Sequence, residues 1–236
     1  GNLELVLQKA GHASLVETKE GEWYMPHLCG RPLPGSKNCN LGRETSIQKV
    51  EWRADDWLYL GGQGNNPLEE VPSPNLEVHK WPSLSERIPF DSPHYAIPRG
   101  PTNSVINLPQ KLTLLGCESL ESNFEQSMLA RRLVNQQAVI TTKMSFEPSC
   151  FQQMAGLAAY YNTYLFHYLY LSRDEKEGLC LQIHSCDDGI SSFPLGEEII
   201  PVSKSELFLR ATFNNCDLQF QFSEDGEHFN NAGPTL

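Results

Sequence analysis

The sequence lacks any long apolar run, since no stretch approaches the roughly 20 residues that a membrane-spanning helix needs. Its first residues also show no basic segment followed by an apolar core. Basic residues are scarce, with 18 Lys and Arg against 29 Asp and Glu and a formal net charge of −11. Such a chain repels nucleic-acid backbones and anionic bilayers on average. We therefore expect a soluble protein that binds no nucleic acid and no membrane and takes a neutral partner.

Cysteine pairs with the spacing of a metal site are lacking as well. The seven cysteines form an odd set without a C-x-x-C pair, and several lie inside apolar, strand-like runs. This pattern argues against a zinc site and favours buried free thiols in a reducing compartment. We expect a cytoplasmic protein, with secretion and a Cys29–Cys39 disulfide left open as alternatives.

Helical periodicity is nearly absent, and short alternating runs take its place. In the first part of the chain they predict strands at residues 13–18, 22–29, 44–52 and 57–60. Four consecutive antiparallel strands are typical of one propeller blade. A single sheet of this size has too little core of its own, so we expect it to be part of a larger body. The abrupt start at Gly1-Asn2 fits that expectation.

Glycine, proline and asparagine are concentrated at residues 61–67 and 71–74, which favours turns and extended chain. We place a domain boundary there, with a first domain at 1–64, a linker at 65–87 and a second domain at 88–236. We expect the second domain to lack its last strands. Its predicted strands are residues 111–115, 126–133, 138–146, 154–160, 166–171, 179–185, 207–213 and 218–222.

Two patterns indicate how these later strands pack. Leu207, Leu209 and Ala211 face one way, as expected of a strand with one buried side. The aromatic residues between Tyr160 and Tyr170 have two readings, a sandwich core or a platform on which a sugar ring stacks. The core reading is the more frequent one.

Several motifs resemble the β-xylosidases and α-L-arabinofuranosidases of glycoside hydrolase family 43 that carry a concanavalin A-like C-terminal domain. In the first domain these motifs are GHASLVET from Gly11, EWY from Glu22, HLCGRP from His27, LGRET from Leu41 and QKVEW from Gln48. In the second they are FEQS from Phe124, ARR from Ala130, FEP from Phe146, FQQMAGL from Phe151, AYY from Ala159 and YLY from Tyr168. The resemblance implies an all-β protein in which the last blade of a five-bladed β-propeller precedes a concanavalin A-like (jelly-roll) β-sandwich.

The resemblance also implies an activity. Such proteins are inverting exo-glycosidases that remove terminal xylose, or arabinofuranose, from short xylan fragments. Inversion uses a carboxylic acid and a carboxylate base held roughly 6.5–9.5 Å apart, with a third carboxylate tuning the acid. In the family these groups come from earlier blades, and no position here matches them. We therefore predict no catalytic residue in this chain and no activity from it alone. The alternative is a non-catalytic sandwich that binds carbohydrate or acts as a brace.

Three residues carry site predictions that follow from the resemblance. Arg43 matches a substrate-contacting arginine, and a guanidinium offers paired donors to sugar hydroxyls; the structural alternative is an ion pair with Glu44 or another residue of the blade. His12 matches a histidine at the propeller axis that binds calcium or water. The structural alternative is a histidine whose ring is hydrogen-bonded by the backbone of a turn. Asp91 is a weaker candidate for a structural calcium in the sandwich, because an Asp before Ser-Pro is usually a turn residue. We expect that no cofactor is required and that calcium is a candidate ion. A homo-oligomer is a candidate state of the full-length protein.

Overall fold

The alternating apolar pattern produces strands throughout the part of the chain that the structure describes. The computed structural model describes residues 4–62, 64–80, 89–90, 92–99, 104–108 and 111–236. Its elements, β1 to β18, are all strands, which confirms the all-β fold class. They belong to two units: Gly1–Ser85 with Val134–Gln136, and Glu86–Leu133 with Gln137–Leu236.

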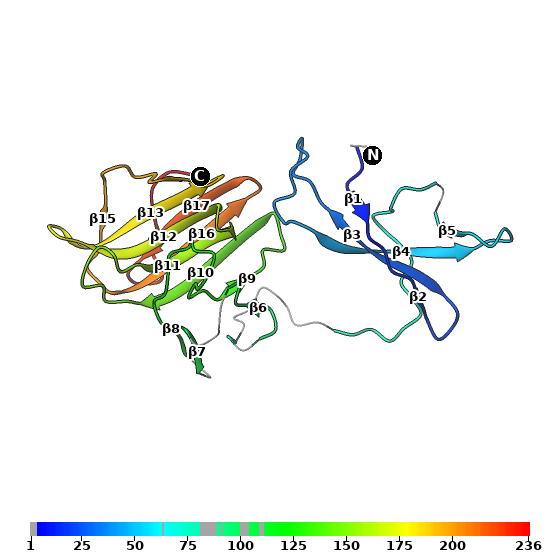
Figure 1. The fold of residues 1–236 in the computed structure, drawn as a ribbon, viewed down its shortest axis with the longest axis horizontal. Coiled ribbons are helices and arrows are strands. Elements are labelled where there is room, and N and C mark those ends of the chain that lie inside the picture. Colours follow the sequence, from blue (N-terminus) through cyan, green and yellow to red (C-terminus); the bar gives the residue numbers. More distant parts are fainter. Residues whose placement is uncertain (1–3, 63, 81–88, 91, 100–103, 109–110) are drawn as a thin grey trace. The chain divides into compact units, whose positions relative to one another are not determined.

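The first unit contains one antiparallel sheet (Figure 1). Its strands are β1 (Gln8–Gly11), β2 (Val16–Glu17), β3 (Trp23–Gly30), β4 (Glu44–Trp52) and β5 (Leu58–Leu60). The strand order is β1-β3-β4-β5, and β2 also pairs with β3. Because β1 and β2 follow the same edge of β3, they act as one interrupted strand, and the sheet has the four-strand path of a propeller blade.

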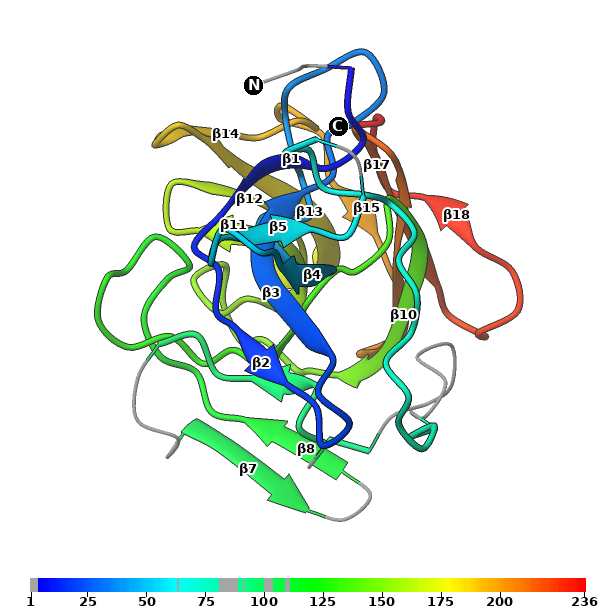
Figure 2. The ribbon, with the colours of Figure 1, turned by 90° about the vertical axis from the view of Figure 1, so that its right-hand side faces the viewer.

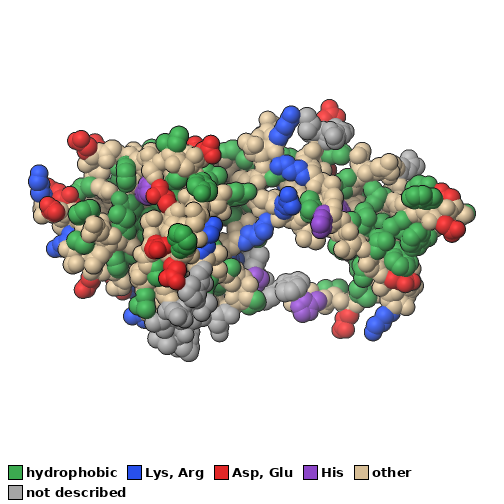
Figure 3. Space-filling model, in the orientation of Figure 1, with side chains coloured by type: hydrophobic (Ala, Val, Ile, Leu, Met, Phe, Trp, Pro, Cys, Tyr) green, Lys and Arg blue, Asp and Glu red, His purple; other side chains and the backbone are tan. Residues whose placement is uncertain are grey.

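Many apolar side chains of this unit are exposed, because a sheet without a second layer cannot bury both faces. Figure 3 shows hydrophobic side chains gathered over β4 and β5. The large exposed ones in the unit are Val6, Leu15, Val16, Ile47, Trp52, Trp57, Leu68, Leu76 and Val78. Trp23 and Trp52 contact each other edge to face, with ring centroids 5.9 Å apart. These two rings therefore pack against each other on the surface of the sheet.

The chain that follows β5 returns to the sheet. Gln48 exchanges two hydrogen bonds with the backbone of Leu68, and the Tyr24 hydroxyl donates to the Pro72 carbonyl at 3.1 Å. The backbone N–H of Asn75 donates to Glu22 at 2.9 Å. Part of the segment expected as a linker thus contacts the blade, while the bounds 1–64, 65–87 and 88–236 stay a prediction.

The second unit contains two larger antiparallel sheets. One has the order β10-β16-β17-β18, with bounds Gln137–Ser145, Glu206–Asn214, Asp217–Ser223 and Asn230–Asn231. The other has the order β11-β12-β13-β14, with bounds Ala155–Asn162, Leu165–Asp174, Gly178–Asp187 and Ile190–Ser192; β15 (Ile200–Pro201) pairs with β13. Two short pairs complete the unit: β6 (Tyr95–Ala96) with β9 (Ala130–Arg131), and β7 (Val105–Leu108) with β8 (Lys111–Leu114). Figure 2 shows β7 and β8 lying side by side.

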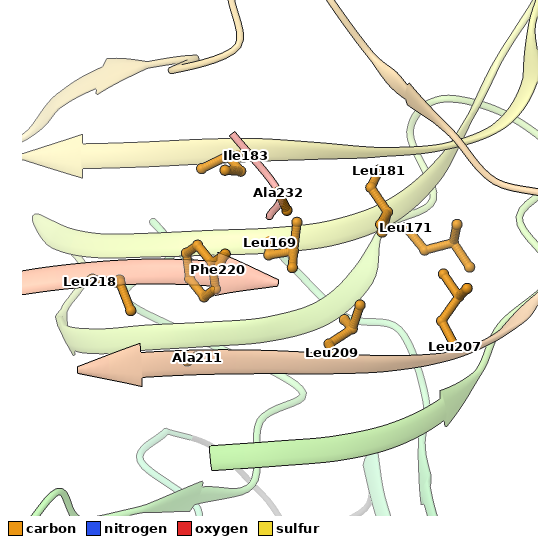
Figure 4. Close-up of a cluster of buried hydrophobic side chains, with 10 residues drawn as sticks. All are labelled: Leu169, Leu171, Leu181, Ile183, Leu207, Leu209, Ala211, Leu218, Phe220 and Ala232. Atoms are coloured by element: carbon orange, nitrogen blue, oxygen red, sulfur yellow. The ribbon is translucent and has the colours of Figure 1, made fainter. Parts of the chain in front are cut away.

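The core of the second unit lies between its two large sheets (Figure 4). Its buried members are Leu169, Leu171, Leu181, Ile183, Leu207, Leu209, Ala211, Leu218, Phe220 and Ala232. The expected alternation along 207–211 is confirmed, since Leu207 and Leu209 have no exposed surface. Burial of this many large aliphatic side chains is the main stabilising contribution to a sandwich.

Some expectations from the sequence are wrong in detail. A strand was expected over residues 126–133, but only Ala130–Arg131 is a strand. The strand expected at 13–18 is reduced to Val16–Glu17. All seven cysteines are free thiols, yet Cys117 and Cys216 are exposed rather than buried.

Candidate functional site

His12 interrupts the outer strand of the blade. It lies between β1 and β2, is exposed, and has a backbone φ of 51°, a conformation that few residues other than glycine adopt. Two residues later the chain rejoins the sheet, where the backbone N–H of Ser14 donates to the Pro26 carbonyl at 3.0 Å. A strained, exposed histidine at a strand interruption is consistent with a binding role.

Arg43 is exposed at the end of the connection between β3 and β4. Gly42 before it has a φ of 72°, a value that favours glycine, and its N–H donates to the Cys39 carbonyl at 2.9 Å. The connection is held down by Leu33 and Leu41, each only 5% exposed. A loop anchored in this way presents its final arginine in a restricted direction.

The pairing register places His12 and Arg43 on opposite sides of β3, offset along the strand. Leu28 of β3 pairs with Gly11 on one side and with Thr45 on the other. Neighbouring strands lie about 4.8 Å apart, so the backbones of Gly11 and Thr45 are about 10 Å from each other. His12 follows Gly11 directly, and Arg43 comes two residues before Thr45. The two predicted site residues therefore flank one strand, which their separation in the sequence does not reveal.

Arg31 and Glu44 form a two-pronged ion pair where β3 ends and β4 begins. The Arg31 Nε donates to Glu44 Oε2 at 2.9 Å, and its terminal nitrogen donates to Oε1 at 2.8 Å. The carboxylate raises the pKa of the Arg31 guanidinium. Glu44, the structural alternative expected as a partner for Arg43, thus has both oxygens engaged by Arg31.

His27 is a third histidine of interest and was not singled out from the sequence. It lies on β3, is 5% exposed, and its Nδ1 is 2.9 Å from the Leu28 carbonyl oxygen. That carbonyl is an acceptor, so Nδ1 carries the proton and Nε2 is an acceptor. Among the described residues Nε2 has no hydrogen-bond partner. Its motif, HLCGRP, was noted for the resemblance, but burial of the ring could not be read from it.

The calcium predictions have limited support. Asp91 lies outside the described residues, so its candidate role stays a prediction. Across the ranges that the structure does describe, no three His, Cys, Asp or Glu side chains are grouped so as to hold a metal ion. Calcium prefers six to eight oxygen ligands. For His12 to contact such an ion, the oxygen ligands would have to come from elsewhere.

Carboxyl groups in the described residues show no sign of a general acid, which needs a raised pKa. Wherever a carboxyl pKa clearly departs from its ordinary value it is lowered, in each case chiefly by a hydrogen bond to the ionised form. These groups are Glu22, Asp55, Glu118, Asp174, Glu224 and Asp225. That this chain carries no catalytic carboxylate stays a prediction.

The aromatic residues of the sandwich do not form the continuous platform considered above. Phe166 and Tyr170 are buried, and burial raises the pKa of Tyr170 to about 12. The Tyr160 hydroxyl donates to the buried Gln126 at 3.3 Å. Only Tyr161 and Tyr164 are exposed, at 66% and 56%. The core reading is therefore correct for most of this aromatic set.

A polar cluster on β13 and β14 was not found from the sequence. His184 Nε2 is 3.0 Å from the Ser191 hydroxyl, which also donates to Glu121. Phe193 stacks on the His184 ring with centroids 5.1 Å apart. Burial lowers the pKa of His184 despite the nearby Glu121. Glu121 lies 70 residues from Ser191 in the sequence, and no motif links it to the other two.

Comparison with known proteins identifies the family. Residues 89–236 match the family described as "Beta xylosidase C-terminal Concanavalin A-like domain", and residues 3–58 match "Glycosyl hydrolases family 43". The chain belongs to glycoside hydrolase family 43. The first match covers the sandwich and the second covers the blade, so the resemblance read from the motifs is confirmed.

The similar proteins are longer than this family 43 chain. A xylan 1,3-β-xylosidase from a Vibrio species is 33% identical over 249 residues, which cover 98% of this chain and 46% of that protein. A β-xylosidase from Bacillus subtilis is 35% identical over 247 residues, which cover 94% of this chain and 44% of that protein. The crystal structure of a xylan β-1,4-xylosidase from Bacillus halodurans matches this chain with a TM-score of 0.87 and 40% sequence identity. The match covers 99% of this chain and 46% of that one. The family 43 chain thus spans a little under half the length of these relatives. In its described residues, no helix is long and apolar enough to cross a membrane.

Proposed function

We propose that this family 43 chain is part of an inverting exo-glycosidase that hydrolyses terminal xylose, and arabinofuranose as a second substrate, from xylo-oligosaccharides. The observation that carries the proposal is the continuous likeness across both units to proteins named as xylosidases. A protein from Humicola insolens named xylosidase/arabinosidase 43B, 35% identical over 98% of this chain, supports the second sugar. The catalytic carboxylates lie outside this chain in the proposal.

The parts of the site that this chain supplies are Arg43 and His12. The exposed Arg43 guanidinium offers paired donors to sugar hydroxyls or to a catalytic carboxylate. His12, in its strained backbone conformation, binds water or a calcium ion near the propeller axis. The hydrolysis itself requires no cofactor. A cytoplasmic location and a homo-oligomeric full-length form remain part of the proposal without further support.

The test is a chimera in which this chain replaces the matching 44% of the Bacillus subtilis β-xylosidase. The chimera should release nitrophenol from 4-nitrophenyl β-D-xylopyranoside, and the sugar first released should have the opposite anomeric configuration by NMR. The 236-residue chain alone and the relative's remaining part alone are the controls, and both should be inactive. A folded chimera without activity on xylosides and arabinofuranosides contradicts the proposal. Turnover by the short chain alone contradicts the placement of the carboxylates.

A non-catalytic carbohydrate-binding role has one observation in its favour, the exposed rings of Tyr161 and Tyr164. Calorimetric titration of this chain with xylo-oligosaccharides distinguishes the two functions. Binding by the sandwich should survive Arg43→Ala, whereas binding by the blade should not. Without binding of either kind, the sandwich is a brace.

A further inference from the structure

The Arg31–Glu44 ion pair has a geometry that the other ion pair of the same sheet lacks. Arg31 grips both oxygens of Glu44 at 2.8–2.9 Å and also donates to the Val134 carbonyl at 3.2 Å. The pair of Lys49 and Glu22 rests on one contact of 2.7 Å. The two pairs are similarly exposed, with side-chain values of 42% and 24% for the first and 32% and 23% for the second. A two-pronged arginine pair fixes orientation as well as distance.

The position of this pair in the fold is the second observation. Arg31 directly follows the last residue of β3, and Glu44 is the first residue of β4. The ion pair therefore closes the base of the connection from 31 to 43. Glu44 is bonded to Arg43 through one peptide link, and Gly42 on the other side has the conformational freedom of glycine. On the Glu44 side, the two-pronged contact with Arg31 fixes the direction of the chain.

We propose that Arg31 and Glu44 are positioning residues for Arg43, a role that rests on the proposed function of Arg43 in binding the sugar. The two-pronged pair sets the direction in which the chain enters β4. That direction determines where the Arg43 guanidinium meets the substrate. Neither Arg31 nor Glu44 touches the sugar in this proposal.

The test uses the chimera described above with Glu44→Gln and Arg31→Lys. Glutamine keeps the shape of Glu44 but removes its charge, and lysine keeps the charge of Arg31 but lacks the planar pair of nitrogens that bonds the two oxygens in parallel. A misplacement of about 1 Å can cost up to about a hundredfold in rate. We expect either variant to lower kcat/KM by roughly tenfold or more, mainly through KM. Glu22→Gln breaks the Lys49–Glu22 pair elsewhere in the sheet. This variant should lose about as much thermal stability as Glu44→Gln but leave KM unchanged.

A double variant separates positioning from general stability. When Arg43 is already Ala, Glu44→Gln should cause no further change in kcat/KM, because there is no guanidinium left to position. An equal loss in the parent and in the Arg43→Ala background overturns the proposal. A loss from Glu44→Gln no larger than that from Glu22→Gln overturns it as well.

Failure of the proposed function is recognised separately. If the parent chimera folds but is inactive, the glycosidase assignment fails, and the positioning role is decided on this chain by amide hydrogen exchange. Glu44→Gln should then speed exchange in residues 39–45, and Glu22→Gln should not. Unchanged exchange in that segment overturns the positioning role.

Discussion

The Gln48 side chain pairs with the backbone of Leu68 as a neighbouring strand would. Its amide nitrogen donates to the Leu68 carbonyl, and its oxygen accepts from the Leu68 N–H, both at 2.9 Å. Gln48 is 2% exposed, so these two bonds satisfy the polar atoms of a buried side chain. One buried glutamine thereby fixes the chain after β5 to the blade.

Replacing Gln48 with Leu should destabilise the first unit. The apolar side chain removes both hydrogen bonds to the Leu68 backbone, and a hydrogen bond typically contributes about 0.5–1.5 kcal/mol. All four tryptophans precede residue 86, so tryptophan fluorescence during urea unfolding reports on the first unit. The midpoint should fall without a change in slope.

Tyr59→Phe is the matched control for this change in the same unit. The Tyr59 hydroxyl donates to Asp55 at 2.8 Å on an exposed surface, and such substitutions usually change stability by less than about 0.5 kcal/mol. If the two variants have the same unfolding midpoint by fluorescence, the Gln48–Leu68 exchange does not stabilise the blade.

Gly156 of β11 should not tolerate alanine. A Cβ at this position would lie 1.9 Å from the carbonyl oxygen of Leu169 on the paired strand, and backbone cannot move aside as a side chain can. Overpacking usually costs about 1–3 kcal/mol, and this contact is with the backbone, so we expect the upper end of that range or more. Calorimetry of Gly156→Ala should show a lower Tm for the sandwich.

Gly116→Ala serves as the comparison for Gly156→Ala. Nothing lies within 4 Å of a Cβ at Gly116. This variant should keep the parent Tm, so equal Tm values for the two variants would show that β11 and β12 can separate at little cost.

The sequence predicts what depends on local alternation. The strand expected at residues 44–52 is observed with those bounds, and the buried face of Leu207 and Leu209 is confirmed. Both depend on side chains that alternate between a core and a wetter face. These features require no knowledge of which strands are neighbours.

The features that local reasoning misses depend on long-range pairing. The strand expected over 126–133 fails because Gln126 turns inward and donates to the carbonyls of Leu120 and Ser122. The Arg31–Glu44 pair depends on the register between β3 and β4, which no spacing in the sequence specifies. For the same reason the resemblance supplied Arg43 and His12, while only the fold shows that they lie on opposite sides of β3.

Arg43 should be sensitive even to lysine. Lysine keeps the charge but loses the paired donors, and a hydrogen bond to a charged group contributes about 1.5–3 kcal/mol. In the chimera, Arg43→Lys should lower kcat/KM by roughly tenfold to a hundredfold. Arg53, whose guanidinium stacks on Tyr59 at 4.1 Å, provides a control arginine in the same unit. If Arg53→Lys reduces kcat/KM as much as Arg43→Lys does, Arg43 has no special contact with the substrate.

The sandwich should lose stability in mild acid because of two histidines. Burial lowers the pKa of both His167 and His184 from the ordinary value of 6.5, and this effect outweighs the nearby carboxylates. As pH falls below about 6.5, the unfolded chain binds protons that the folded chain does not yet accept, so the free energy of unfolding decreases. The loss continues until the pH passes the lowered pKa values of the folded state. Calorimetric Tm values between pH 7.5 and 5 should therefore fall less for a His167→Gln, His184→Gln double variant than for the parent. A parallel decline in both proteins would mean that other groups cause the acid sensitivity.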